Sequence, residues 1–171
     1  MKINATYEAL KEVVFIDITT EDEITPSAIE YSLSSSFSDE TIAILTYNLE
    51  TILAEKLETI ISRGEGSSRP RDRYNLYTLY YMRKEQIDMT VLRQALENTS
   101  QKRESLELLK QWSEQVSSVR HSSYQRELWD RYQRQFAYAK EISFEASVEI
   151  VELWCQGCNC TKRKFKRRYS L

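Results

Sequence analysis

Two cationic side chains in the middle of the chain, Lys56 and Arg63, have the types and spacing to bind an anion, and Asp72 is an acidic residue that could pair with either of them. Lys56 lies within a stripe of apolar residues at helical spacing, and Arg63 returns to nearly the same side of that helix, roughly 10 Å further along. Taking an unpaired ammonium out of water costs several kcal/mol, so a lysine on this buried face needs an acidic partner or an anionic ligand. A simpler alternative is that its aliphatic stem passes the leucines and its charge reaches solvent.

A second helix is predicted to begin near Arg69, because two glycines and two serines end the first helix and Pro70 suits a first helical turn. Asp72 then lies in the opening turns of this helix. Since a short loop joins the two helices, we expect them to pack as an antiparallel pair that brings Asp72 opposite Lys56 or Arg63. An aspartate at a helix start also has a simpler explanation, because it favours the positive end of the helix dipole by about 0.3–1 kcal/mol.

The composition indicates a globular protein of one domain that is rich in helix. The 171 residues are 41% hydrophobic and 29% charged, with a net charge of −2, and they include only three glycines and two prolines. No apolar run approaches the roughly 18 residues of a membrane helix, and the N-terminus lacks the apolar core of a signal peptide. We therefore expect a cytoplasmic protein with no membrane partner.

The hydropathy pattern predicts short strands first and helices afterwards. Residues 2–8 and 12–19 are expected to form a β-hairpin. Residues 20–39 are polar and serine-rich, which is typical of a surface connection, with a helical turn at residues 27–31 and a short extended segment at residues 41–45. Apolar stripes predict four further helices at residues 90–97, 102–119, 124–136 and 143–154.

These elements predict an α+β protein in which a short hairpin precedes a mainly helical bundle. A hairpin alone is marginally stable in water, so we expect it to be the remnant of a larger sheet. The expected segments are a partial sheet region at residues 1–46, a helical domain with the Lys and Asp motifs at residues 47–155, and an unstructured cysteine-rich and basic tail at residues 156–171.

Asp17 is a carboxylate within the second predicted strand, V-V-F-I-D-I-T. Side chains alternate along a strand, so Asp17 points to the face opposite Ile16 and Ile18. Strands disfavour aspartate, which suggests a specific role for it, but an edge strand with one face in water explains it equally well.

The three cysteines lie close together at Cys155, Cys158 and Cys160. C-x-x-C-x-C has no fourth ligand nearby, whereas zinc sites generally use four. The two alternatives are therefore a metal site and an unstructured tail with reduced cysteines.

Residues 162–168 contribute six of the 24 basic residues, which leaves 18 basic against 26 acidic residues in the acidic body of the chain. This basic run could contact nucleic-acid phosphates, although terminal basic runs are more often solvated tails.

A family resemblance is carried by three blocks of sequence: I-D-I-T-T-x-D-x-I-T-P, then E-T-I-L-A-E-K-L-E-T-I-I-S-R, then R-x-R-D-x-Y-x-L-Y. Over about residues 1–155 the chain resembles the abortive-infection nucleotidyltransferase toxins of the AbiEii/AbiGii family. The resemblance implies a toxin of a bacterial toxin–antitoxin and phage-defence system, with a small polymerase-type nucleotidyltransferase sheet followed by a helical domain. It also implies a nucleoside triphosphate substrate, Mg²⁺, transfer RNA as the acceptor in some members, and an antitoxin encoded nearby that does not contact the toxin directly.

The resemblance also implies roles for single residues. Lys56 resembles the lysine that contacts the triphosphate and Asp72 the essential acid of the last motif, so both are expected to be catalytic. Arg63 resembles a supporting cation of the nucleotide-binding site, and Asp17 resembles a sheet carboxylate at the metal site. These roles suit the residue types, because Mg²⁺ prefers carboxylate and phosphate oxygens and fixed cations offset the charge of the leaving pyrophosphate.

Two departures from the family pattern affect the expected activity. Asn75 replaces the second acid of R-D-x-x-D-L-Y, and an amide cannot carry that negative charge. The Gly-rich turn and the R-x-T-x-D-x-D strand with its paired aspartates do not occur in the sequence. We therefore expect the last two thirds of a toxin, from a truncated or split gene, that is an active enzyme only when the missing lobe is supplied. The alternative is a non-catalytic helical binding module or an inactive remnant.

Overall fold

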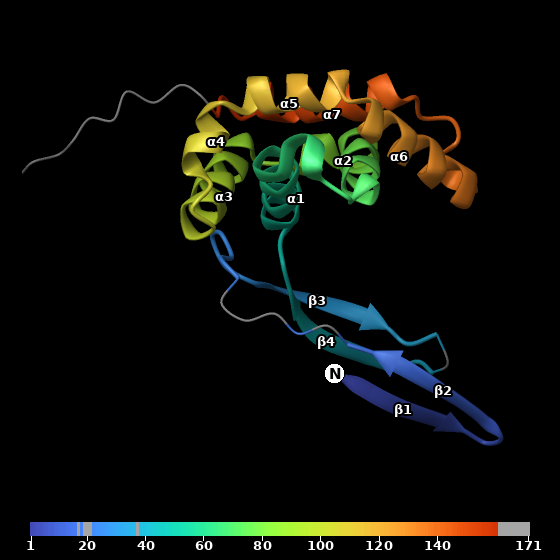
Figure 1. Ribbon diagram of the computed structural model, residues 1–171. Coiled ribbons are helices and arrows are strands. Elements are labelled where there is room, and N and C mark those ends of the chain that lie inside the picture. The colour runs from blue at the N-terminus through green and yellow to red at the C-terminus, as the bar shows by residue number, and fades with distance from the viewer. Residues whose placement is uncertain (17, 19–21, 37, 161–171) are drawn as a thin grey trace, which may run out of the picture.

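A computed structural model describes residues 1–16, 18, 22–36 and 38–160 of the chain. Among these residues, a pair of β-hairpins precedes a region of seven α-helices, so the predicted α+β fold is confirmed (Figure 1). The strands are β1 (Lys2–Tyr7), β2 (Leu10–Phe15), β3 (Ile29–Ser34) and β4 (Thr41–Thr46). The helices are α1 (Leu49–Arg63), α2 (Pro70–Arg83), α3 (Met89–Lys102), α4 (Leu106–Lys110), α5 (Trp112–His121), α6 (Ser123–Gln135) and α7 (Phe144–Gly157).

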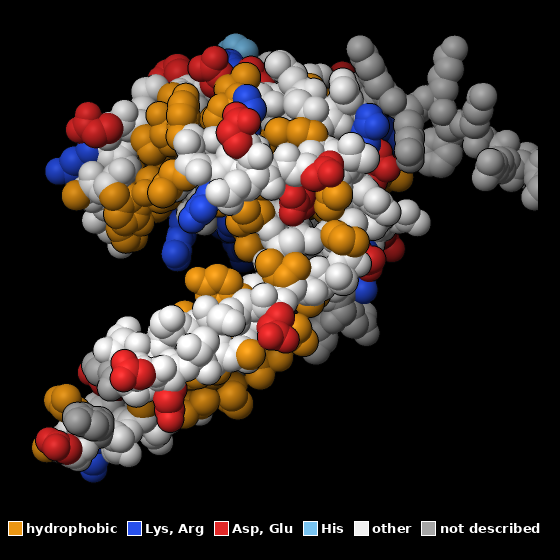
Figure 2. Space-filling view, turned by 180° about the vertical axis from the view of Figure 1, so that it is seen from behind, with side chains coloured by type: hydrophobic (Ala, Val, Ile, Leu, Met, Phe, Trp, Pro, Cys, Tyr) orange, Lys and Arg blue, Asp and Glu red, His pale blue; other side chains and the backbone are white. Residues whose placement is uncertain are grey.

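The two hairpins are separate two-stranded antiparallel sheets. Lys2 lies opposite Phe15 at one end of the β1–β2 ladder, and Ile29 lies opposite Thr46 at one end of the β3–β4 ladder. In Figure 2 the hairpins project from the helical region and carry apolar side chains on their surface. Exposed apolar side chains on these strands are Ile3, Leu10, Val13, Val14, Phe15, Ile29, Tyr31, Leu33, Ile42, Ile44 and Leu45. Large exposed apolar patches of this kind mark interaction surfaces.

Strand β3 contradicts the predicted helical turn at residues 27–31. Ile29, Tyr31 and Leu33 alternate with polar residues at the period of two that is typical of a strand, and β4 supplies their hydrogen-bonding partner. The surrounding serines gave this segment the composition of a loop. The predicted extended segment at residues 41–45 is confirmed as β4, and the first predicted hairpin is confirmed as β1 and β2, although β2 begins at Leu10 rather than at residue 12.

The prediction of one helix over residues 102–119 is wrong, because α3 continues to Lys102 and the chain then turns before α4 and α5. Glu104, in this turn, has a φ of 56°. The turn is held by α1, since Ser105 Oγ donates to Glu58 Oε1 at 2.8 Å and Arg103 donates to Glu58 Oε2 at 2.7 Å. Contacts with α1 therefore interrupt residues 102–119, although the apolar spacing of this segment suits one continuous helix.

The core of the helical region surrounds α1, which packs against α2, α3, α4 and α5 (Figure 1). Two tryptophans, Trp129 of α6 and Trp154 of α7, are fully buried in this core. The Trp154 indole N–H donates to the Leu76 carbonyl oxygen at 3.1 Å and so fixes α7 against α2. The predicted apolar stripes therefore form the core of a helical bundle.

Polar contacts join the second hairpin region to the start of α1. Asn48 caps this helix, because its Oδ1 accepts from the Thr51 N–H at 2.8 Å and its Nδ2 donates to the Thr25 carbonyl oxygen at 2.7 Å. Beside this cap, the Tyr47 hydroxyl donates to Asp22 Oδ2 at 2.8 Å. These contacts tie the chain before β3 to the helical region.

The Tyr47–Asp22 hydrogen bond predicts a loss of stability at high pH. This hydrogen bond, together with burial, raises the pKa of Tyr47 to about 12. Because an unfolded tyrosine titrates near 10, the stabilisation is fully present below a pH of about 10 and is lost as the pH rises through about 12. We expect Asp22→Asn to return the Tyr47 pKa towards 10 in an NMR titration, with Tyr47→Phe used to assign the resonance. An identical titration curve in Asp22→Asn would contradict the contact.

Candidate functional site

The first two helices bring Lys56 and Asp72 together. Lys56 lies in the middle of α1 and Asp72 in the first turn of α2, and Lys56 Nζ is 3.3 Å from Asp72 Oδ1. A short turn at residues 64–66 and Pro70 at the start of α2 reverse the chain between them. The two side chains are 24% and 14% exposed, so the pair is shielded on one side but open to a ligand. The predicted contact across the helix pair is confirmed for Lys56.

Arg63 does not share the buried face of α1 with Lys56, contrary to the prediction. It is exposed, because α1 ends at Arg63 and its side chain extends beyond the packed core. It nevertheless faces the same region as Lys56, since both line one cavity beside α1.

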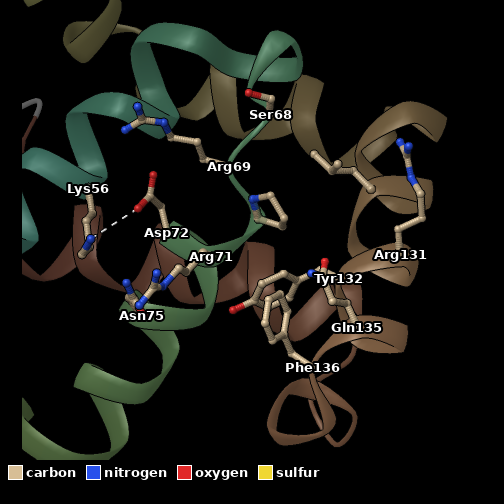
Figure 3. Close-up of a pocket in the computed structure, with 12 residues that line it drawn as sticks. Lys56, Ser68, Arg69, Arg71, Asp72, Asn75, Arg131, Tyr132, Gln135 and Phe136 are labelled. Carbon is tan, nitrogen blue, oxygen red and sulfur yellow. Dashed lines mark hydrogen bonds and ion pairs between the residues drawn. The ribbon is translucent and has the colours of Figure 1, made fainter. Parts of the chain in front are cut away.

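Two cavities meet at the Lys56–Asp72 pair, and Figure 3 shows the residues around the larger one. The larger cavity, of about 770 Å³, lies between the start of α2 and α6, and the smaller cavity, of about 470 Å³, lies beside α1. Lys56, Arg69 and Asp72 line both cavities. The larger cavity is completed by Ser68, Pro70, Arg71, Asn75, Leu128, Arg131, Tyr132, Gln135 and Phe136, and the smaller by Glu55, Glu58, Thr59, Ser62, Arg63 and Arg103.

Basic side chains dominate the larger cavity, where four of them accompany one carboxylate. Within the described residues of the chain, Arg63, Arg69 and Arg131 form no ion pair, whereas Arg103 is bound to Glu58. Figure 2 shows Lys and Arg side chains gathered at the hollow between the helical region and the hairpins. These three arginines are therefore available to bind an anionic ligand.

A buried hydrogen-bond network holds the loop between α1 and α2. Gln125 of α6 is fully buried, and its Nε2 donates to the carbonyl oxygens of Glu65 at 2.7 Å and Ser67 at 2.6 Å. Its Oε1 accepts from Arg73 at 2.6 Å, and the Arg73 guanidinium also lies 5.5 Å from the centre of the Trp129 ring. Burial lowers the pKa of Arg73 to about 10, so this arginine is still charged at neutral pH. The network fixes the start of α2, which carries the site.

The described residues do not form the Mg²⁺ site that the family resemblance implies. Asp17, the predicted metal ligand, lies outside the described residues. Among those that are described, no group of three or more His, Cys, Asp or Glu side chains is placed to hold a metal ion. Asp72 is paired with Lys56 and Glu58 with Arg103, so the carboxylates nearest the cavities already have cationic partners. This donor set does not fit a two-metal centre.

Sequence reasoning missed the wall of the larger cavity that α6 provides. Tyr132 and Phe136 were predicted only as members of an apolar stripe, yet both line this cavity, with Arg131 beside them. The sequence did contain a signal for the opposite wall of this cavity, at the start of α2. Arg69 and Arg71 lie on either side of Pro70, directly before Asp72. The α6 residues had no such signal, because core and cavity positions share the same helical spacing.

The cysteines pack against the end of the helical region. Helix α7 extends to Gly157 and Cys158 is buried, so the expected start of the unstructured tail at residue 156 is too early. Cys158 Sγ lies 2.6 Å from Cys160 Sγ, and this contact together with burial raises the pKa of Cys158. These thiols form no metal-binding group with other described residues. Most of the predicted basic tail, residues 161–171, lies outside the described residues.

The fold and the site together define an α+β protein with two arginine-lined cavities that meet at a Lys–Asp pair on its first two helices. The family model described as nucleotidyl transferase AbiEii toxin, type IV TA system, matches residues 1–150. The chain belongs to this family, and membership implies an antitoxin partner. No curated protein and no solved structure matches the chain. Across the residues that the structure describes, no helix has the length and apolar character needed to cross a bilayer.

Proposed function

We propose that the chain acts as a nucleotidyltransferase toxin of its type IV system and transfers a nucleotide from a nucleoside triphosphate to an acceptor such as tRNA. The observation that carries this proposal is the Lys56–Asp72 pair, which lies where two arginine-lined cavities meet. Both substrates occur in the cytoplasm, where we place the protein. The antitoxin would then act without contacting this site.

In the proposed reaction the acceptor hydroxyl attacks the α-phosphorus of the triphosphate. The hydroxyl O–H bond breaks, an O–P bond forms, and the bond from phosphorus to the leaving pyrophosphate breaks. Lys56, Arg63 and Arg69 would offset the charge of the triphosphate and of the pyrophosphate, because fixed cations are the main catalytic contribution in phosphoryl chemistry. When Lys56 binds phosphate oxygens instead of Asp72, the Asp72 carboxylate would be free to accept the proton of the acceptor hydroxyl.

We assign the Mg²⁺ ligands to residues other than the described ones, because the described carboxylates do not form a metal-binding group. We propose that paired aspartates outside this sequence, on strands that extend the hairpins, supply the missing ligands. Two observations support this: each hairpin is a two-stranded sheet with open edges, and its apolar side chains are exposed.

The test is to incubate the purified chain with labelled nucleoside triphosphates, Mg²⁺ and bulk tRNA, alone and with a polypeptide that carries the R-x-T-x-D-x-D strand. We expect labelled tRNA only in the complemented sample. If the complemented sample also stays unlabelled, the transfer activity is refuted and the second candidate, a non-catalytic helical binding module, is favoured. That candidate rests on the lack of metal-binding carboxylates among the described residues of the chain.

A further inference from the structure

The two cavities that meet at Lys56 and Asp72 differ in chemistry. The smaller one is lined by four cationic side chains, three carboxylates and the hydroxyls of Thr59 and Ser62, and no aromatic residue lines it among the described residues. Its carboxylates are all paired, with Lys56 or Arg103, which leaves Arg63 and Arg69 without an ion pair among the described residues. Hydroxyl and guanidinium groups donate hydrogen bonds to phosphate oxygens, but offer no flat apolar surface to a base. The smaller cavity therefore suits a chain of phosphates.

The larger cavity combines arginines with an aromatic wall. Tyr132 of α6 and Phe136, the residue that follows this helix, line it, with ring centres 4.8 Å apart, and Figure 3 places both rings across the cavity from Lys56. Leu128, one turn before Tyr132, adds apolar surface to the same wall. The cavity volume of about 770 Å³ lies within the usual range of about 300–1,000 Å³ for small-molecule sites.

Contacts among its own rings hold the aromatic wall in place. The Tyr132 and Tyr138 hydroxyls are 3.1 Å apart, and Tyr138 stacks on Phe136 with ring centres 5.4 Å apart. Burial and the contact with Tyr138 raise the pKa of Tyr132, so its hydroxyl stays protonated. Phe136 is partly exposed at the cavity, so one side of its ring is held by neighbours and another is open to a ligand.

We propose that one nucleoside triphosphate binds across the Lys56–Asp72 pair, with its triphosphate in the smaller cavity and its nucleoside in the larger one, where the base stacks on Phe136. This inference rests on the proposed function, because it takes the nucleoside triphosphate as the ligand. A single molecule can span both cavities, because Lys56, Arg69 and Asp72 line each of them. Stacking on an aromatic ring is tolerant of base identity, so this site would accept several nucleotides.

Calorimetry with the full chain can test the assignment without any transfer reaction. The titrants are the four nucleoside triphosphates and inorganic tripolyphosphate, each with Mg²⁺. We expect the wild-type chain to bind at least one nucleoside triphosphate about tenfold more tightly than tripolyphosphate, since one stacked base contributes on that scale. This comparison needs no substitution and so does not depend on whether a variant folds.

Two substitutions then locate the triphosphate and the nucleoside. Phe136→Leu should weaken nucleoside triphosphate binding about tenfold and leave tripolyphosphate binding unchanged, because it removes the ring but keeps apolar volume. Arg63→Gln should weaken the binding of both titrants. The matched control is Tyr124→Leu, which removes an exposed aromatic ring from the start of α6 without touching either cavity.

Three results would overturn the assignment. If nucleoside triphosphates bind no more tightly than tripolyphosphate, the larger cavity does not hold the nucleoside. If Phe136→Leu weakens the binding of a single-stranded RNA oligonucleotide but not of nucleoside triphosphates, the larger cavity takes the acceptor instead, and the proposed function survives. If neither triphosphate nor tripolyphosphate binds to the chain, this inference fails, and the complemented transfer assay decides separately whether the proposed function holds.

Discussion

Replacing Lys56 by methionine is expected to lower the rate of nucleotidyl transfer by about 10²–10³-fold, which is the usual effect of removing one charge-stabilising group from an active site. Methionine keeps most of the side-chain volume but cannot contact phosphate oxygens. Asp72→Asn is expected to have an effect of similar size, because the amide no longer accepts a proton. The measurement is the initial rate of label transfer to tRNA in the complemented assay.

Lys110→Met is the matched control for Lys56→Met. Lys110 also pairs with a carboxylate, that of Glu107, but both side chains are exposed and neither lines the two cavities. Thermal unfolding of all variants separates lost chemistry from lost folding. If Lys56→Met transfers label as fast as Lys110→Met, the Lys56–Asp72 pair is structural only, worth about 0–1 kcal/mol as a partly exposed ion pair.

Gln125→Leu is expected to destabilise the protein by about 3–5 kcal/mol, because it leaves a buried charge without its hydrogen-bond acceptor. The Arg73 side chain is almost fully buried, and its Nε and one terminal nitrogen already lack a partner, so Gln125 Oε1 is its hydrogen-bonding contact among the described residues. The substitution also frees the carbonyl oxygens of Glu65 and Ser67. Urea unfolding followed by circular dichroism measures the change.

Gln156→Leu provides the comparison, since Gln156 lies exposed near the end of α7 and should change the free energy of unfolding by less than about 0.5 kcal/mol. Equal stability of the two variants would mean that the Arg73–Gln125 network contributes little. A partial loss that is restored by Arg73→Met in the Gln125→Leu background would instead identify the buried charge as the source of the cost.

The helices of the site were predictable because their signals are local. Apolar spacing over residues 49–61, the glycines of the following turn and Pro70 specify two consecutive helices, whatever packs on them. Once two helices are joined by so short a loop, the antiparallel pairing that brings Asp72 to Lys56 follows from chain geometry.

Other features depended on contacts between distant segments. The turn at residues 103–105 is held by Glu58 on α1, and β3 is a strand because β4 pairs with it. Glu58 lies about 45 residues before the turn that it holds, so no local pattern could indicate that contact. In β3 the period-two alternation was present, but the surrounding serines gave the segment the composition of a loop until its pairing with β4 was known. The same reason explains why Arg63 was wrongly placed on the buried face: helical azimuth is a local property, whereas burial depends on where the neighbouring helices end.

The sequence by itself therefore determined the family, the first two helices and a contact of Asp72 with either Lys56 or Arg63, because motif order, helical spacing and loop length are all properties of a continuous segment. Only the tertiary structure decided that two cavities meet at this pair and that α6 provides the aromatic wall of one of them. Phe136 reaches the site from 64 positions beyond Asp72 because α6 folds back against α2. Periodicity cannot tell such a residue from one buried in the core, since Phe136 continues the apolar spacing of α6.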